Sequence, residues 1–510
     1  MSADDLREII REMLLELDEQ AHGRAIASII RRAARNGSGW APAPVSDEVA
    51  EAVAFATVAQ RLGHAEPSEV DEHLRRAMGA FLRKDYAAAH QILGTLLRPI
   101  CNGDIDLGQH EMVDEVLGAD TVECAAQYVV SAYMISLPPA RADAVCAAIE
   151  EVRGVGHFWE PIRAMERAAV EPLPGLDTFL PQWRDLAVRK SADERTSEWD
   201  TEEDRWLREV VQRLEGSDGL AKIARSTRRA DDLRAWCRTL VAAGDWKGAL
   251  ESFEEAARLV ADKEYVRGEF LDGAAQAAQQ LGGDDLAGRL ERAWRAGPSM
   301  LRLRRWLGSA STAPALLQRA AQALDSCPRH AARQRAFLRV LQGDFEPAAK
   351  LLAAAPGLGW SDGEHPGHLL FSLFTRLLGG PNATSPRPDL LAQEEMETEE
   401  LGSTTGDDRE LRLAAPEIDQ ILRRVGIDGI SDVAVRGAAL AAMRKAAESR
   451  LAGVTGQQRR HSYRHAAHLV AARVGCEPSA ESAAWVATLR AEYRRFPALS
   501  AELDRALGSS

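Results

Sequence analysis

The chain has 510 residues and a formal net charge of −14, from 63 Lys and Arg against 77 Asp and Glu. Its 45% hydrophobic and 27% charged residues are typical of a chain that buries a large core, and the length allows about three domains or one extended repeat array. No window approaches about 18 uninterrupted apolar residues, which excludes a membrane span, and the acidic N-terminus is unlike a secretory signal. The six cysteines are scattered without a Cys-x-x-Cys pair, which predicts reduced, mostly buried thiols in a cytoplasmic protein.

Almost every segment has apolar residues at helical spacing and no convincing alternating strand run occurs, so the sequence predicts an all-α fold. The expected order is a helical pair and linker at 1–45, a helical domain with one repeat-like hairpin at 46–205, a helical-repeat domain at 206–380, a disordered acidic linker at 381–412 and a C-terminal helical domain at 413–510. Within the second of these, 154–161 is predicted to be a tight turn with Trp159 packed beneath it. The charged stretch 190–205 is predicted to be a solvated helix or a hinge.

One short motif occurs three times, at 84–89, 244–249 and 343–348. Each copy has a turn residue (Lys or Gly), then Asp, an aromatic residue, two free positions and Ala. In a helical hairpin the turn residue ends the first helix, the Asp caps the second, and the alanine lets the two backbones approach closely. The motif therefore predicts three helical hairpins.

These motifs resemble those of the tetratricopeptide-like (TPR-like) helical-repeat superfamily, most closely around the second copy. There the packing positions of such a repeat are occupied by Trp236, Leu240, Ala249, Phe253, Ala256 and Leu259. The resemblance implies helical hairpins stacked as an α-solenoid with a concave groove that binds a partner. Because the copies start 160 and 99 residues apart, the implied solenoid is irregular, and a smaller C-terminal helical unit follows it.

Arginine is concentrated between Arg289 and Arg339, where eleven arginines occur with only two acids. Guanidinium groups suit phosphates and carboxylates, and tryptophan stacks on bases or on guanidinium groups. The candidate partner-binding residues of this arginine-rich segment are Arg302, Arg304, Arg305, Trp306, Arg333 and Arg335. Two alternatives remain: a helical face whose arginines pair with acids of neighbouring helices, and a contact with the acidic run 394–408 folded back on it.

Histidines and carboxylates come together in two other places. The Gly-rich loop before a very apolar helix contains Trp360, Asp362, Glu364, His365 and His368. These residue types suit a divalent metal or acid–base chemistry, although Gly and Pro at such a loop are also explained by a structural turn. Further along, His461, His465 and His468 share one face of a predicted helix, where the flanking Arg459, Arg460 and Arg464 favour a polar interface or a phosphate-facing stripe over a metal site.

No strong catalytic motif is present, because no lysine follows a glycine as in a phosphate loop, and nucleophile-elbow and zinc-protease motifs are missing. The sequence therefore favours a non-catalytic adaptor or scaffold that binds a protein partner in a bacterial multi-protein complex, with no cofactor, metal or membrane partner. One alternative is a nucleic-acid-binding subunit of a regulatory or defence complex that uses the arginine-rich segment 289–339. Another is a metalloenzyme that uses the loop 360–368.

Overall fold

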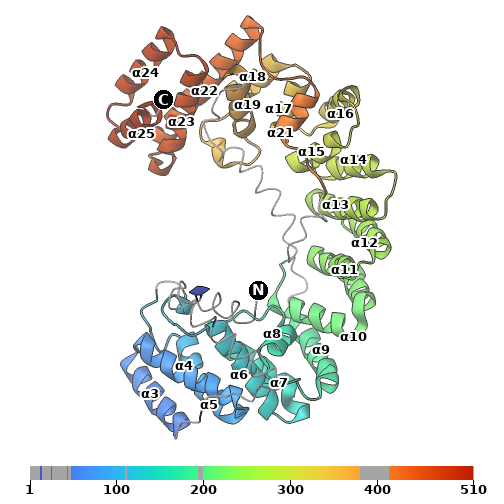
Figure 1. The fold of residues 1–510 in the computed structure, drawn as a ribbon, viewed down its shortest axis with the longest axis vertical. Helices are drawn as coiled ribbons and strands as arrows, with labels where there is room; N and C mark the ends of the chain where they lie inside the picture. The colour runs from blue at the N-terminus through green and yellow to red at the C-terminus, as the bar shows by residue number, and fades with distance from the viewer. Residues whose placement is uncertain are drawn as a thin grey trace. The chain divides into compact units, whose positions relative to one another are not determined.

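The computed structural model describes residues 12–13, 25, 43, 47–109, 112–192, 199–379 and 413–508. These residues form 22 α-helices and contain no strand, so the prediction of an all-α fold is confirmed (Figure 1). None of the described helices combines the length and the apolar character that crossing a membrane requires. The helical pair predicted at 1–45 and the linker predicted at 381–412 lie outside the described residues, apart from residues 12, 13, 25 and 43.

The chain divides into two compact units, Met1–Trp236 and Cys237–Ser510, called here the N-terminal and C-terminal units. The division falls within α11, whereas the boundary expected from the sequence lies at 205/206, inside α10. The reason for the difference is local. The described end of the charged stretch, residues 199–205, contains a capped helix start, at which the side chains of Thr201 and Asp204 accept each other's backbone N–H groups.

Consecutive helices of the N-terminal unit pack on one another, as α4 does on α5, α5 on α6 and α9 on α10. Its helices are α3 (Glu48–Leu62), α4 (Pro67–Leu82), α5 (Tyr86–Cys101), α6 (Thr121–Ile135), α7 (Arg141–Glu151), α8 (Pro161–Ala168), α9 (Leu176–Ala192) and α10 (Glu202–Thr227), followed by α11 (Ala230–Ala242), which continues into the next unit. A chain of buried rings joins α6, α9 and α10. Ring centroids are 5.0 Å apart for Tyr133 and Phe179, 5.7 Å for Phe179 and Trp183, and 5.3 Å for Trp183 and Trp206. Each buried ring contributes roughly 2–3 kcal/mol.

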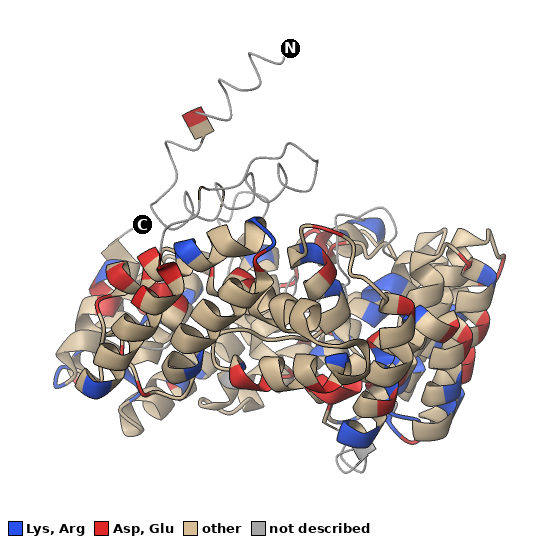
Figure 2. Cartoon of the chain, turned by 90° about the horizontal axis from the view of Figure 1, so that it is seen from below, with Lys and Arg blue, Asp and Glu red and all other residues tan. Residues whose placement is uncertain are grey.

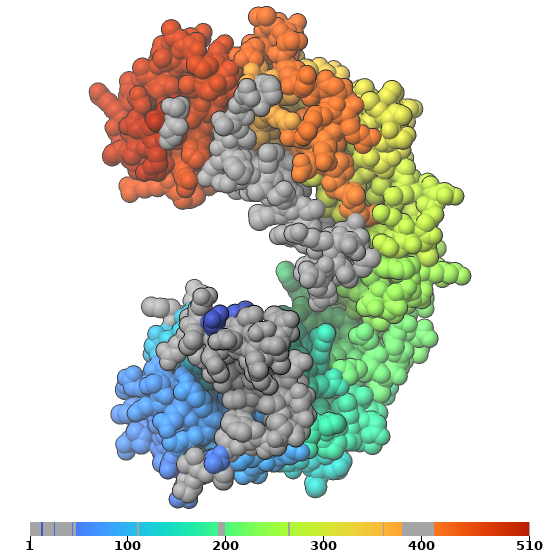
Figure 3. All heavy atoms as spheres, in the orientation of Figure 1, coloured from blue at the N-terminus to red at the C-terminus, as the bar shows by residue number. Residues whose placement is uncertain are grey.

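The C-terminal unit begins with helices that lie one after another (Figures 1 and 3). These are α12 (Trp246–Leu259), α13 (Glu264–Gln280), α14 (Leu286–Ala296), α15 (Met300–Gly308) and α16 (Ala313–Ser326). The remaining helices are α17 (Ala332–Leu341), α18 (Phe345–Ala354), α19 (Gly367–Gly379), α21 (Ile418–Arg424), α22 (Val433–Gly456), α23 (Tyr463–Cys476), α24 (Ala480–Glu492) and α25 (Pro497–Gly508).

One hydrophobic core runs through most of this unit, from Ala275 in α13 to Leu503 in α25. It includes α22 and α23, because α22 packs on α18 and α23 packs on α19. The structure therefore differs from the separate domain predicted at 413–510. The apolar faces of α22 and α23 are buried against helices that precede residue 380, so the residues after 413 share their core with them.

Each copy of the repeated motif lies between two helices: α4 and α5, α11 and α12, and α17 and α18. The turn residue adopts a left-handed conformation in every copy, with φ of 66° at Lys84, 71° at Gly244 and 78° at Gly343. The motif alanine is fully buried in every copy, as predicted for a close approach of two helices.

The aspartate cap forms in two of the three copies. Asp85 accepts a hydrogen bond from the Ala88 amide at 3.1 Å, and Asp245 accepts one from the Gly248 amide at 2.9 Å. Asp344 instead pairs with Arg339 at 2.7 Å. Arg339, in the last turn of α17, thus competes with the backbone amides of α18 for the Asp344 carboxylate. The motif does not include this arginine and so does not reveal the competition.

Candidate functional site

Five of the six candidate residues of the arginine-rich segment are buried. Arg302 is 2% exposed, Arg304 and Arg305 are 8% exposed, and Trp306 and Arg333 are also interior; Arg335 is half-buried. These residues therefore do not form an exposed basic surface. Figure 2 likewise shows Lys and Arg interspersed with Asp and Glu along the helices in view.

The buried guanidinium groups are held by partners within the C-terminal unit. Arg302 Nε lies 2.7 Å from Asp272 Oδ2, and Arg305 Nη1 lies 3.5 Å from Asp272 Oδ1. Burial holds the pKa of Arg305 below its ordinary value, although Asp272 acts in the opposite direction. Arg304 Nε donates to the Pro416 carbonyl at 2.8 Å. This hydrogen bond links α15 to the segment just before α21.

Other arginines of the segment also have intramolecular partners. Arg333 donates to the Gly363 carbonyl and Arg335 to the Cys327 carbonyl, both at 2.9 Å. At the start of the segment, the half-buried Arg289 pairs with Glu254 of α12 at 2.5 Å and the exposed Arg295 pairs with Glu291 of α14 at 2.7 Å. The acidic run 394–408 lies outside the described residues.

The loop before α19 meets one of the three histidines predicted on α23. The Trp360 ring lies 4.6 Å from the ring of His365, 5.4 Å from that of His368 and 4.7 Å from that of His465, between centroids. The loop at 360–368 and the histidines at 461–468, which are a hundred residues apart in the sequence, therefore meet in one cluster. The exposed His461 is not part of it.

Within this cluster the polar groups serve the loop itself. His365 Nδ1 accepts the Gly367 amide and Nε2 lies 3.1 Å from the Pro356 carbonyl. Burial lowers the pKa of His368 to about 4, with smaller contributions from His365 and Arg333. The carboxylates have other partners: Asp362 accepts the Glu364 amide, and Glu364 accepts the Gln334 side chain, both at 3.0 Å.

No group of three or more His, Cys, Asp and Glu side chains suited to a metal ion occurs in the described part of the chain. The cluster around Trp360 thus consists of imidazole rings packed on an indole, and it joins the loop before α19 to α23.

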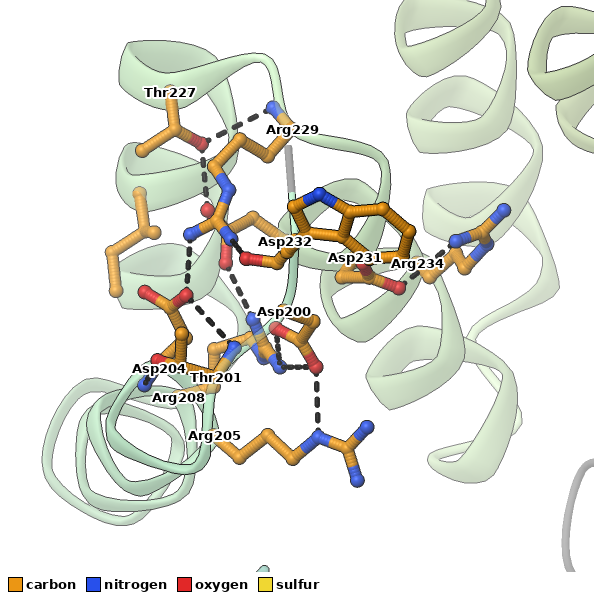
Figure 4. Close-up of polar contacts among 12 residues, drawn as sticks. Asp200, Thr201, Asp204, Arg205, Arg208, Thr227, Arg229, Asp231, Asp232 and Arg234 are labelled. Carbon is orange, nitrogen blue, oxygen red and sulfur yellow. Dashed lines mark hydrogen bonds and ion pairs between the residues drawn. The ribbon is translucent and has the colours of Figure 1, made fainter. Parts of the chain in front are cut away.

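A different arrangement, which the sequence did not reveal, lies at the start of α10 in the N-terminal unit. Arg208 bridges two carboxylates, with Nη2 2.7 Å from Asp200 Oδ1 and Nη1 2.9 Å from Asp232 Oδ1 (Figure 4). Asp232 is fully buried and also accepts the Thr227 hydroxyl at 2.7 Å. Burial lowers the pKa of Arg208, but the carboxylates of Asp200 and Asp232 outweigh it and hold that pKa above its ordinary value.

A second buried pair lies beside the first. Arg229 Nη1 is 2.7 Å from Asp204 Oδ2, and Arg229 Nη2 donates to the Trp199 carbonyl at 2.5 Å (Figure 4). Three successive residues are thus held in place, Trp199 by its carbonyl, Asp200 by its carboxylate and Thr201 by the cap of α10.

Two exposed tryptophans are linked to this buried network, Trp199 through its carbonyl and Trp159 through Arg205. The Trp199 side chain is 83% exposed although its backbone is fixed. Arg205 Nε pairs with Asp200 at 2.7 Å, and the Arg205 guanidinium carbon lies 3.5 Å from the centroid of the Trp159 ring, which is 42% exposed. Trp159, Trp199 and Arg205 are called here the Trp surface.

The placement of Trp159 corrects the prediction that it packs beneath the turn at 154–161. Phe158 takes that place: it is buried, and its carbonyl accepts the Trp206 indole N–H at 2.6 Å. Sequence signals of the Trp surface do exist, namely a tryptophan among acids at 198–200 and the Thr-x-x-Asp capping pattern that follows it.

Comparison of the chain with protein-family models, with curated proteins and with solved structures finds no significant match. The function is therefore inferred from the chemistry of the sites described above.

Proposed function

We propose that the chain is a non-catalytic helical-repeat adaptor that binds a protein partner through the Trp surface of its N-terminal unit. The observation that carries the proposal is the Trp199 indole, which is 83% exposed while its backbone carbonyl accepts a hydrogen bond from Arg229, a buried residue that is ion-paired with Asp204. Trp and Arg dominate the binding energy of protein interfaces, and a side chain on a fixed backbone loses little entropy when it binds.

The surroundings of the Trp surface favour a protein over a nucleic acid. The first turn of α10 carries Glu202, Glu203 and Asp204. Glu202 and Glu203 pair with Arg153 at 3.3 and 2.8 Å, so the region contributes no surplus positive charge. A polyanion would be repelled by these acids, whereas a partner with an apolar pocket for the indole would not.

The three hairpins support the further proposal that the helices stack as an irregular, TPR-like α-solenoid. All three share the left-handed turn and the buried alanine that such repeats use for close packing. The six unpaired cysteines support a cytoplasmic location, and five of them are buried. We place the chain in a bacterial multi-protein complex, in which it needs no cofactor.

The proposal is tested with a photo-crosslinking amino acid at position 199 and, as a control, at position 433, because Trp199 and Val433 are both 83% exposed. A partner protein is expected to crosslink at 199 and not at 433. Co-purification of that protein is expected to fall by about tenfold with Trp199→Ala and to stay unchanged with Val433→Ala. Equal yields with the two variants, at unchanged helix content, would refute a role of the Trp surface.

A further inference from the structure

The turn between α22 and α23, taken here together with the first turn of α23, carries four exposed basic side chains: Arg459, Arg460, His461 and Arg464. No Asp or Glu occurs in the sequence from 450 to 475, which contains five arginines and three histidines. The local charge is therefore positive without compensation along the chain, in a protein whose formal net charge is −14.

The three arginines of this turn differ from the other arginines of α22 and α23. Arg473 pairs with Glu477 at 2.8 Å, and the buried Arg450 donates to the Gly357 carbonyl at 3.1 Å. Within the described residues, Arg459, Arg460 and Arg464 have no ion pair and no side-chain hydrogen bond. Their donors are available to a ligand.

The backbone keeps these cations close together. Gln458 has a left-handed φ of 51°, the Arg459 amide donates to the Val454 carbonyl at 2.9 Å, and the Ser462 amide donates to the Arg459 carbonyl at 3.0 Å. In water, two unit charges about 7 Å apart repel by roughly 0.6 kcal/mol. Local unfolding of the turn would separate the charges but would cost free energy. A bound polyanion removes the repulsion while the turn stays folded.

We propose that this basic turn binds the phosphodiester backbone of a nucleic acid. Guanidinium groups bind phosphate oxygens bidentately, and several adjacent cations match a ligand with regularly repeated charges better than a single carboxylate. The aromatic residue nearest to the turn, Tyr463, is buried and offers no face for base stacking. Binding is therefore independent of base sequence and strongly dependent on salt. This site is separate from the Trp surface and does not depend on the function proposed above.

The test is fluorescence anisotropy of the full chain with a labelled duplex of about 20 base pairs, in a DNA and an RNA form of equal sequence. Three phosphate contacts predict that log K falls with log salt with a slope of about −2.7 for the DNA duplex. The triple variant Arg459→Ala, Arg460→Ala, Arg464→Ala is expected to bind at least about tenfold more weakly at 50 mM salt, with a slope near zero. The two duplexes identify whether DNA or RNA is preferred, and binding of either supports the proposal.

The matched control is Arg289→Ala, Arg292→Ala, Arg295→Ala, which removes the same net charge from arginines that pair with Glu254 and Glu291. This control is expected to bind like the unmodified chain. The proposal is overturned if the unmodified chain shows no salt-dependent binding or if the two triple variants weaken binding equally. It is also overturned if poly-glutamate or inorganic phosphate, at matched ionic strength, displaces the duplex as well as unlabelled duplex does. Trp199→Ala leaves nucleic-acid binding unchanged, which separates this site from the protein-binding surface.

Discussion

Replacement of Arg208 by Met tests whether the buried ion network of the N-terminal unit holds α10 and α11 together. Methionine keeps most of the apolar stem of Arg208 and removes its guanidinium group. Asp232, which is fully buried, then retains only the Thr227 hydroxyl, whereas Asp200 keeps its ion pair with Arg205. The variant therefore leaves one buried carboxylate without a cation.

The expected cost follows from the burial of Asp232. Removal of one partner of a buried ion pair costs about 3–5 kcal/mol, because the remaining charge is uncompensated. Protonation limits this cost, since neutralising an aspartate carboxyl at pH 7 requires about 4 kcal/mol. We therefore expect Arg208→Met to lower the unfolding free energy by about 3–4 kcal/mol at pH 7 and by less at pH 4.5, where protonation is cheaper.

Hydrogen exchange of the backbone amides in α10 and α11 measures this free energy locally, without assuming that the whole chain unfolds in one step. The double variant Arg208→Met, Asp232→Asn is expected to recover at least about 2 kcal/mol, because asparagine carries no charge. The control is Arg213→Met, which breaks a more exposed pair with Glu166 and should cost less than about 1 kcal/mol. A cost of Arg208→Met below about 1 kcal/mol at pH 7, or a double variant no more stable than the single one, would refute this account of the network.

Three further predictions concern single residues. Burial raises the pKa of Glu209 from 4.5 to about 7. The fold therefore favours the protonated carboxyl, and the unfolding free energy of the N-terminal unit falls by up to about 3 kcal/mol as pH rises from 4.5 to 7. Glu209→Gln should flatten this pH dependence in thermal unfolding, and an unchanged dependence would contradict the role of Glu209. Burial lowers the pKa of His368 from 6.5 to about 4. The unfolding free energy of the C-terminal unit therefore falls by up to about 3 kcal/mol as pH falls from 6.5 to 4. His368→Asn should remove this acid sensitivity; if the variant is equally sensitive to acid, another group is responsible. A Cβ atom on Gly357 would lie 1.9 Å from the Ser449 carbonyl oxygen, whereas one on Gly363 would meet open space. Gly357→Ala should therefore lower the unfolding free energy of the C-terminal unit by at least about 2 kcal/mol, and Gly363→Ala should not. Equal melting temperatures of the two variants would disprove the close contact at Gly357.

The helices and hairpins were predictable because their signals are local. Helical spacing of apolar residues and the Asp-aromatic-x-x-Ala motif specify a turn within a few residues, and the caps at Asp85 and Asp245 form as this motif predicts. The exception, Asp344, has a competing arginine five residues before it, outside the span of the motif. Unit boundaries were less predictable, because the apolar faces of α22 and α23 do not reveal in the sequence which helices cover them.

The sites depended on contacts between residues far apart in the chain. Helical spacing gives no sign that Arg302 meets Asp272 thirty residues earlier, or that Arg304 meets the Pro416 carbonyl after residue 412. The partner-binding surface expected of the arginine-rich segment is therefore absent, because Arg302, Arg304, Arg305 and Arg333 are buried. The Trp surface was missed for the opposite reason: the charged stretch 190–205 resembled a solvated helix or a hinge, although the neighbouring network contains the buried Asp204 and Asp232.

The use of arginine explains why net charge describes this protein poorly. The last carbonyls of a helix have no partner within the helix, and a guanidinium group carries five donors in a planar fork. Arg436 donates to the Leu378 carbonyl in the last turn of α19 and to the Cys476 carbonyl at the end of α23, at 2.7 and 3.0 Å. Arg302 and Arg335 likewise bind the carbonyls that follow α14 and α16. A lysine ammonium lacks the fork that reaches two such carbonyls at once, which gives a physical reason for a chain with 56 arginines and seven lysines. Arginines that bind helix ends are positive charges already engaged by the fold, whereas the exposed arginines at 459, 460 and 464 have no such partner within the described residues and keep their charge for a ligand.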